Sequence, residues 1–187
     1  IEAWAVSLSY TFQIYFDFSG YSDMAIGAAL MFNLRLPINF NSPYKAFNIQ
    51  AFWQRWHISL STWFRDYLFL PLAYYFSDRM KKKRYLKVKT TLILYIIAAS
   101  VTFILCGFWH GAAWTFVIWG AYHGLFLILD KIFLKKLLKR SGRFISTIFT
   151  FGVVVLGWVM FRIENMDNAW SFYTKMFSFD FQIPEEY

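Results

Sequence analysis

The sequence predicts an all-α, polytopic transmembrane protein with additional interfacial or re-entrant helices, organised as one membrane domain over residues 1–187. Of its 187 residues, 58% are hydrophobic and 24% aromatic, an apolar share above that of ordinary soluble domains. Residues 90–130 contain two apolar windows of bilayer length, and 144–163 contain a third. Lysine and arginine gather between these windows, as expected for the loops of a membrane protein.

The formal net charge of +8 lies mainly in two basic clusters, at 79–89 and at 131–143. Because neither cluster follows one amphipathic helix face, the charge does not indicate a nucleic-acid partner. The positive-inside rule places both clusters on the cytoplasmic side, so 90–130 is expected to form a transmembrane hairpin with its apex near 108–113. The predicted location is the cell (inner or plasma) membrane, as a multi-pass protein whose first partner is the lipid bilayer.

Residues 1–36 are expected to form a transmembrane or broken helix, because small residues alternate with aromatic ones there. Asp17 and Asp23 are charges at expected membrane depth, where a carboxylate needs a cavity or a partner. This makes both candidates for a functional site. For Asp17 the alternatives are a structural polar network or a helix break near Gly20.

Residues 43–76 are expected to form interfacial or re-entrant helices, because tryptophans stand beside arginines there. Ser42 is placed to cap the first helix and Pro43 to occupy its first position. Pro71 is expected to break the segment. On a helix, Ser61 and Arg65 would share a face with His57, which could line a passage or be solvated.

The remaining C-terminal segments are a transmembrane helix at 144–163 and a short amphipathic helix at 165–178. In the latter, Trp170, Tyr173 and Phe177 recur at helical spacing. The acidic stretch 179–187 is expected to be an irregular outside loop. No signal peptide is evident, and the chain is expected to begin within a longer protein.

Among the three histidines, His110 has the surroundings that best suit catalysis. It lies between two apolar helices and beside Gly111, which would allow a substrate to approach closely. An imidazole with a pKa near neutrality can accept a hydroxyl proton and return it, although a packing histidine is an equal alternative. His123 and Cys106 are expected to be structural. The histidine spacing predicts no metal site.

Helix geometry imposes one constraint on His110. It lies 21 residues beyond Lys89, so a perpendicular helix would carry it roughly 30 Å, to the far side of the bilayer. A buried reaction centre would therefore require a tilted helix, a broken helix or a funnel from the outside, and the last two are the expected solutions.

Four motifs resemble the bacterial branch of the membrane-bound O-acyltransferase (MBOAT) family, which includes alginate O-acetylation proteins and D-alanyl transfer proteins. They occur in the family's order and indicate the C-terminal portion of a member. The motifs are YFDFSGYSDMA at 15–25, NFNSPY at 39–44, FWQRWHISLSTWFRDY at 52–67 and GFWHG at 107–111.

The resemblance implies that His110 is the family's essential histidine and His57 the second member of the catalytic pair. His110 would act as general base, while His57 would orient the acyl group or donate a hydrogen bond to the developing oxyanion. Six further residues are expected along the substrate passage or supporting the site: Asp17, Arg55, Ser61, Arg65, Asp66 and Trp109.

The implied activity is transfer of an acyl group, expected to be acetyl, from a cytoplasmic thioester such as acetyl-CoA or an acyl carrier. The acceptor would be a hydroxyl of an extracytoplasmic polysaccharide or of a partner acyltransferase. No bound cofactor is expected, because the thioester is a co-substrate. Alternatives are D-alanyl transfer to teichoic acid, a membrane passage, and a scaffold subunit.

Overall fold

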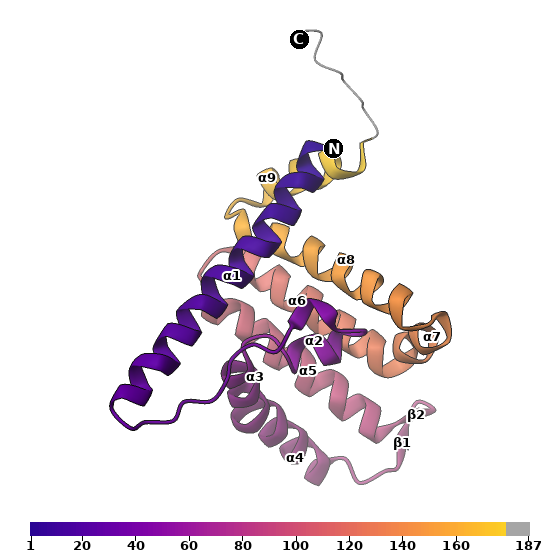
Figure 1. Ribbon diagram of the computed structural model, residues 1–187. Helices are drawn as coiled ribbons and strands as arrows, with labels where there is room; N and C mark the ends of the chain where they lie inside the picture. Colours follow the sequence, from indigo (N-terminus) through magenta and orange to yellow (C-terminus); the bar gives the residue numbers. More distant parts are fainter. Residues whose placement is uncertain (179–187) are drawn as a thin grey trace, which may run out of the picture.

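A computed structural model describes residues 1–178, which form an almost entirely helical assembly (Figure 1). The predicted all-α class is therefore confirmed. The tail expected at 179–187 lies outside the described residues. The elements are α1 (Glu2–Met31), η1 (Pro43–Lys45), α2 (Ile49–Trp53), α3 (Ile58–Phe64), η2 (Arg65–Phe69), α4 (Leu70–Arg79), β1 (Arg84–Tyr85), β2 (Val88–Lys89), α5 (Thr90–His110), α6 (Trp114–Leu129), η3 (Asp130–Leu134), α7 (Lys135–Ser141), α8 (Arg143–Arg162) and α9 (Met166–Phe177).

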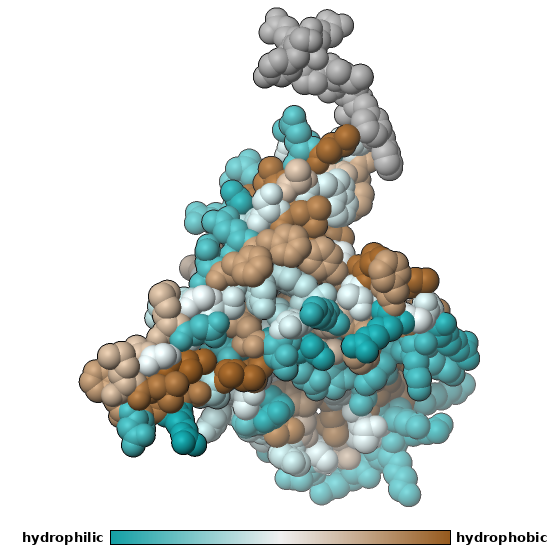
Figure 2. All heavy atoms as spheres, in the orientation of Figure 1, coloured by the Kyte–Doolittle hydropathy of each residue, from teal (hydrophilic) through white to brown (hydrophobic). Residues whose placement is uncertain are grey.

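Three continuous helices are long and apolar enough to span a bilayer: Thr90–His110, Trp114–Ser141 and Arg143–Arg162. The first two form the antiparallel hairpin of α5 and α6, and its turn lies at 111–113. Both basic clusters consequently lie at the end of the hairpin opposite His110. In Figure 2, hydrophilic side chains gather over this end, around α4, α7 and the short β1–β2 hairpin.

Close approach of the α5 and α6 backbones depends on two glycines. A Cβ at Gly107 would overlap the carbonyl oxygen of Phe116, and one at Gly120 would overlap that of Phe103. In lipid, helices associate through packing contacts rather than through the expulsion of water, so small residues at the interface are decisive. The turn that carries His110 is thus held by a tightly packed helix pair.

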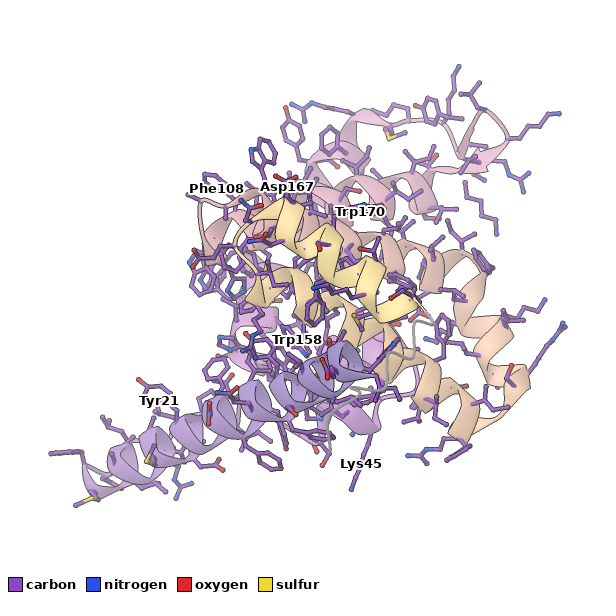
Figure 3. All side chains as sticks on the ribbon, turned by 90° about the horizontal axis from the view of Figure 1, so that it is seen from above. Tyr21, Lys45, Phe108, Trp158, Asp167 and Trp170 are labelled. Atoms are coloured by element: carbon purple, nitrogen blue, oxygen red, sulfur yellow. The ribbon has the colours of Figure 1, made fainter. Side chains whose placement is uncertain are left out.

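α1 is one uninterrupted helix of 30 residues, so the alternative of a helix break near Gly20 is wrong. A single glycine inside a helix costs about 1 kcal/mol, which 30 residues of helix tolerate. The N-terminal part of α1 packs on α9, where the Trp4 indole donates to the Met176 carbonyl at 2.8 Å. The C-terminal part protrudes from the body, and Tyr21 lies on this protrusion (Figures 1 and 3).

The segment expected as helices over 43–76 begins with two short pieces, η1 and α2, and continues as one helical run through α3, η2 and α4. Ser42 makes no side-chain cap and precedes only the 3₁₀ turn η1, whereas Asn48 caps α2 by accepting from the Ala51 amide at 2.7 Å. Pro71 does not end the helix. It lies in the first turn of α4, directly after the π-helical η2. The wider π turn relieves the clash that proline would cause in an α-helix.

An aromatic core joins α2, α6 and α8 beneath α1. Phe52, Trp119 and Trp158 are almost fully buried, and Figure 3 shows Trp158 in the interior where α1 crosses the body. His123 is completely buried among these rings, with its ring 5.1 Å from that of Trp119. This position agrees with the structural role expected for it.

The amphipathic helix expected at 165–178 is present as α9, but its buried face differs in part from the expected one. Ala169 and Met176 are buried, and the Tyr173 hydroxyl donates to the Leu156 carbonyl at 2.6 Å. Trp170, in contrast, is 72% exposed. The tyrosine therefore docks α9 on α8, while the tryptophan faces outward.

Candidate functional site

A cavity of about 570 Å³ lies where α1 crosses the ends of α5, α6 and α8 and the turn between α2 and α3. It brings together four of the residues singled out by sequence: Asp17, His57, Trp109 and His110. These residues are up to 93 positions apart in the chain (110 − 17). The fold therefore gathers the two candidate catalytic histidines on one cavity.

His110 is the last residue of α5 and lies directly before the Gly111 C-cap. Its ring packs against those of Trp119, at 5.2 Å, and Phe161, at 5.1 Å, both with edge geometry. These contacts hold the ring from two neighbouring helices. Within the described part of the chain no protein group makes a hydrogen bond to the His110 ring, so its nitrogens are available to a substrate.

His57 occupies the N-cap position of α3 with a left-handed backbone, φ 43° and ψ 59°. For a residue with a Cβ this conformation costs energy and persists only where surrounding contacts enforce it. Two backbone bonds do so: Asn41 N–H donates to the Arg55 carbonyl at 3.0 Å, and Ile58 N–H to the Asn39 carbonyl at 2.9 Å. The turn is thus clamped to the segment after α1.

The Asn39 side chain favours one tautomer of His57. Asn39 Oδ1 accepts from the Ser59 backbone N–H at 3.1 Å, which identifies this atom as oxygen, and it lies 3.1 Å from His57 Nδ1. Because an amide oxygen can only accept, this contact favours a proton on Nδ1, and the Ser59 hydroxyl is engaged by the same oxygen at 2.8 Å, closer than its 3.5 Å from Nδ1. In this tautomer the neutral His57 ring has its lone pair on Nε2.

Burial favours this neutral form. His57 is half-buried, with its ring 4.7 Å from that of Phe18. Desolvation lowers the pKa of His57 below its ordinary value, because the charged ring loses hydration. Near neutral pH His57 is consequently a hydrogen-bond acceptor at Nε2.

Four other expected site residues lie outside this cavity. Ser61 and Arg65 line a second cavity of about 360 Å³ between α3, η2 and α5. Arg55 donates to the Asn41 carbonyl at 3.3 Å and so supports the His57 turn. Asp66 pairs with its neighbour Arg65 at 2.7 Å on the exposed surface.

The Arg65–Asp66 pair is exposed, with 59% of the arginine side chain and 41% of the aspartate side chain accessible to solvent. The hydrogen bond between the two side chains lowers the pKa of Asp66 and raises that of Arg65. Exposed pairs of this kind are strongly screened and contribute little to stability. Asp17 and Asp23 are also exposed, and of the two only Asp17 borders the histidine cavity.

Three cavities form a row from the histidines to the basic end of the hairpin. The histidine cavity shares Trp53 and Leu60 with the second cavity. The second shares Gln50, Tyr95 and Leu127 with a third of about 420 Å³ beside the lysines of η3 and α7.

α5 runs unbroken from Thr90 to His110, so the broken-helix solution to the depth of His110 is wrong. Its hydrogen-bonded turns continue through an apolar sequence without proline, and the chain bends only at Gly111. Two of the three solutions remain: a tilted helix, or a funnel that reaches the site from the outside.

Asn39 is a site residue that was not predicted from the sequence. Its motif, NFNSPY, is one of the four that resemble the MBOAT family, but the sequence alone gives Asn39 no role. The available signal was its place in a motif that resembles the family, next to a motif that contains His57. Nothing in local periodicity indicates that residues 39 and 57 meet.

Replacing Asn39 with alanine is expected to lower acyl transfer roughly tenfold to a hundredfold, because it frees the His57 ring to rotate and change tautomer. The control is Asn41→Ala, because the hydrogen bonds of Asn41 to Arg55 use only the Asn41 backbone. Initial rates in membranes with matched protein levels measure the effect. Equal rates for Asn39→Ala and wild type would show that the bond does not position His57.

The fold and the cavity define a polytopic helical membrane protein with two histidines at a site inside its helix assembly. A sequence model of the MBOAT, membrane-bound O-acyltransferase family matches residues 1–163. The chain belongs to this family.

Individual relatives agree with this assignment. The chain is 48% identical to a "Peptidoglycan O-acetyltransferase" of Helicobacter pylori, over 90% of the chain and 30% of the relative. It is 47% identical to a "Probable alginate O-acetylase AlgI" of Azotobacter vinelandii, over 95% and 33%, and 34% identical to a "Teichoic acid D-alanyltransferase" of Bacillus subtilis, over 81% and 39%. The chain thus spans about a third of the length of these curated relatives.

Proposed function

We propose that the protein containing this chain moves an acetyl group from a cytoplasmic thioester to a hydroxyl on the outside of the cell membrane. The acceptor is a polysaccharide of the cell envelope or a partner protein that completes the transfer. The observation that carries the proposal is the shared cavity, which both His57 and His110 line. The names of the relatives, two O-acetyl-transferring proteins at 47–48% identity, support acetyl as the group.

In the proposed reaction His110 accepts the proton of the acceptor hydroxyl as its oxygen attacks the thioester carbonyl. The tetrahedral intermediate then expels the thiolate, and His110 returns the proton to the sulfur. The products are an ester and a free thiol, so no other reactant is required. The free ring nitrogens of His110 and the aromatic rings that hold it suit a general base.

For His57 the geometry favours orienting a substrate over donating to the oxyanion. In the tautomer that Asn39 favours, the Nδ1 proton is donated to Asn39 Oδ1, and neutral Nε2 accepts from a substrate N–H or O–H. Donation to an oxyanion from Nε2 would require the imidazolium form, which burial disfavours. In this proposal His57 therefore holds the substrate while His110 moves the proton.

The second cavity, which shares Trp53 and Leu60 with the histidine cavity, supports a donor route that enters beside α3 and η2. Ser61 and Arg65 border this second cavity, where they would contact the thioester arm. Asp17 and Trp109 border the histidine cavity itself, where they would contact the acceptor. The thioester is consumed as a co-substrate, and no resident cofactor enters the proposed reaction.

D-alanyl transfer is the second candidate, because the Bacillus subtilis relative is 34% identical over 81% of the chain. The two activities differ in the acyl group released from the product. Surface polymer from cells with and without the protein is treated with mild base, and the released acids are identified. Acetate that depends on the protein is the expected result. Protein-dependent alanine would establish the second candidate, and release of neither would favour a passage or scaffold role.

A further inference from the structure

The third cavity, of about 420 Å³, lies at the end of the α5–α6 hairpin opposite His110. The helix that continues α6 as η3 and α7 forms one wall, and Tyr95 of α5 and Gln50 of α2 contribute to the others. Four lysines of this continuing helix line the cavity: Lys131, Lys135, Lys136 and Lys139.

Three of these lysines follow one another at intervals of four residues, so the sequence concentrates like charge along one side of the helix. Among residues 1–178 the single ion pair is Arg65–Asp66, so none of the four lysines has a carboxylate within salt-bridge distance. The one acidic residue of the cavity, Asp130, is 4% exposed and directs Oδ2 toward the Gln50 N–H at 3.2 Å. A net positive charge remains, and a bound anion would relieve its repulsion.

Two of the lysines are already held in place. Lys131 Nζ lies 5.4 Å from the centroid of the Tyr95 ring, at cation–π distance. Lys135 Nζ donates to Gln50 Oε1 at 3.3 Å. Lys136 and Lys139 have no such contact within the described chain. The cavity therefore combines two fixed ammonium groups with two that can close on a ligand.

The neighbours of the lysines are apolar and outward-facing. Ile132 is 50% exposed and Phe133 49% exposed, and both border the same cavity on a helix long enough to span the bilayer. On a spanning helix, exposed apolar side chains are placed to lie against acyl chains. A ligand with a phosphate and a hydrocarbon part would satisfy both halves of this surface.

We propose that this cavity binds the phosphate of an anionic phospholipid headgroup, with the acyl chains lying along Ile132 and Phe133. Basic pockets between spanning helices on the cytoplasmic side recognise anionic headgroups in this way. A soluble thioester donor is the other possible source of the same phosphate chemistry. Unlike a phospholipid, it has no acyl chains to lie along Ile132 and Phe133. The lipid would fix the end of the hairpin whose other end carries His110.

The test measures phosphatidylglycerol retained by the purified, intact protein, by native mass spectrometry after exchange from mixed phosphatidylglycerol–phosphatidylcholine nanodiscs. The test variant is K131Q/K135Q/K136Q/K139Q. The control, K81Q/K82Q/K83Q/K87Q, removes the same charge from the exposed basic segment at the same end of the hairpin. We expect the test variant to lose phosphatidylglycerol at least about tenfold and the control to retain it.

A second variant, K136Q/K139Q, controls for misfolding, because it leaves the contacts of Lys131 with Tyr95 and of Lys135 with Gln50 intact. This variant is expected to lose part of the lipid. Equal loss in the test and control variants would overturn the proposal in favour of general surface attraction, and unchanged retention in both variants of the cavity would overturn it outright. Displacement of the lipid by stoichiometric coenzyme A would assign the phosphate site to the soluble donor instead.

Discussion

Replacing His110 with alanine is expected to lower the rate of acyl transfer about 10²- to 10⁴-fold, or roughly 3 to 5 kcal/mol in barrier height. The substitution removes the group that accepts the hydroxyl proton, while the cavity and the thioester route stay in place. Initial rates of ester formation in membranes, at equal protein levels, measure the effect. Since the base acts in the transition state, most of the loss should appear in kcat.

His110→Gln provides the matched control, because it keeps a polar side chain of similar length but cannot serve as a base near neutral pH. The proposed mechanism predicts that glutamine and alanine are about equally inactive, while the unfolding midpoint of the glutamine variant stays near that of wild type. If glutamine restored the rate, His110 would be a hydrogen-bonding residue and not the base.

Replacing Gly120 with alanine is expected to destabilise the α5–α6 pair by at least about 1 to 3 kcal/mol, the usual cost of overpacking a tight interior. The added Cβ would overlap the Phe103 carbonyl oxygen, and backbone cannot move aside as a flexible side chain can. The helices must separate, and the turn that carries His110 must shift with them. Activity should therefore fall together with stability.

Gly152→Ala is the control for this prediction. Gly152 also lies within a spanning helix, α8, but a Cβ there would have no atom within 4 Å. Thermal unfolding midpoints in detergent and protein abundance in membranes are compared for the two variants. Similar behaviour of both would mean that the glycine at 120 does not set the distance between α5 and α6.

The spanning helices could be predicted from sequence because their signal is local. Apolar runs of bilayer length, bounded by lysine clusters, specify α5, α6 and α8 without any information about contacts to the rest of the chain. The hairpin turn near Gly111 follows from the same pattern. The shared cavity of His57 and His110 was implied by the family motifs and not by any spacing in the sequence.

Elements whose shape depends on distant contacts could not be predicted in this way. Gly20 suggested a break in α1, but surrounding helix overrides one glycine. Pro71 suggested a helix end, but a π turn upstream accommodates it. The tautomer of His57 depends on Asn39, 18 residues away, and is visible only once the fold brings the two side chains together.

The central claim is that His110 carries out the chemistry in the cavity it shares with His57. The most direct test measures ester-linked acyl groups on surface polymer from cells that produce the wild-type protein or His110→Ala at matched membrane levels. The proposed mechanism predicts loss of the ester with normal protein abundance. Retention of the ester in His110→Ala would contradict it and point to a passage or scaffold role for the cavity.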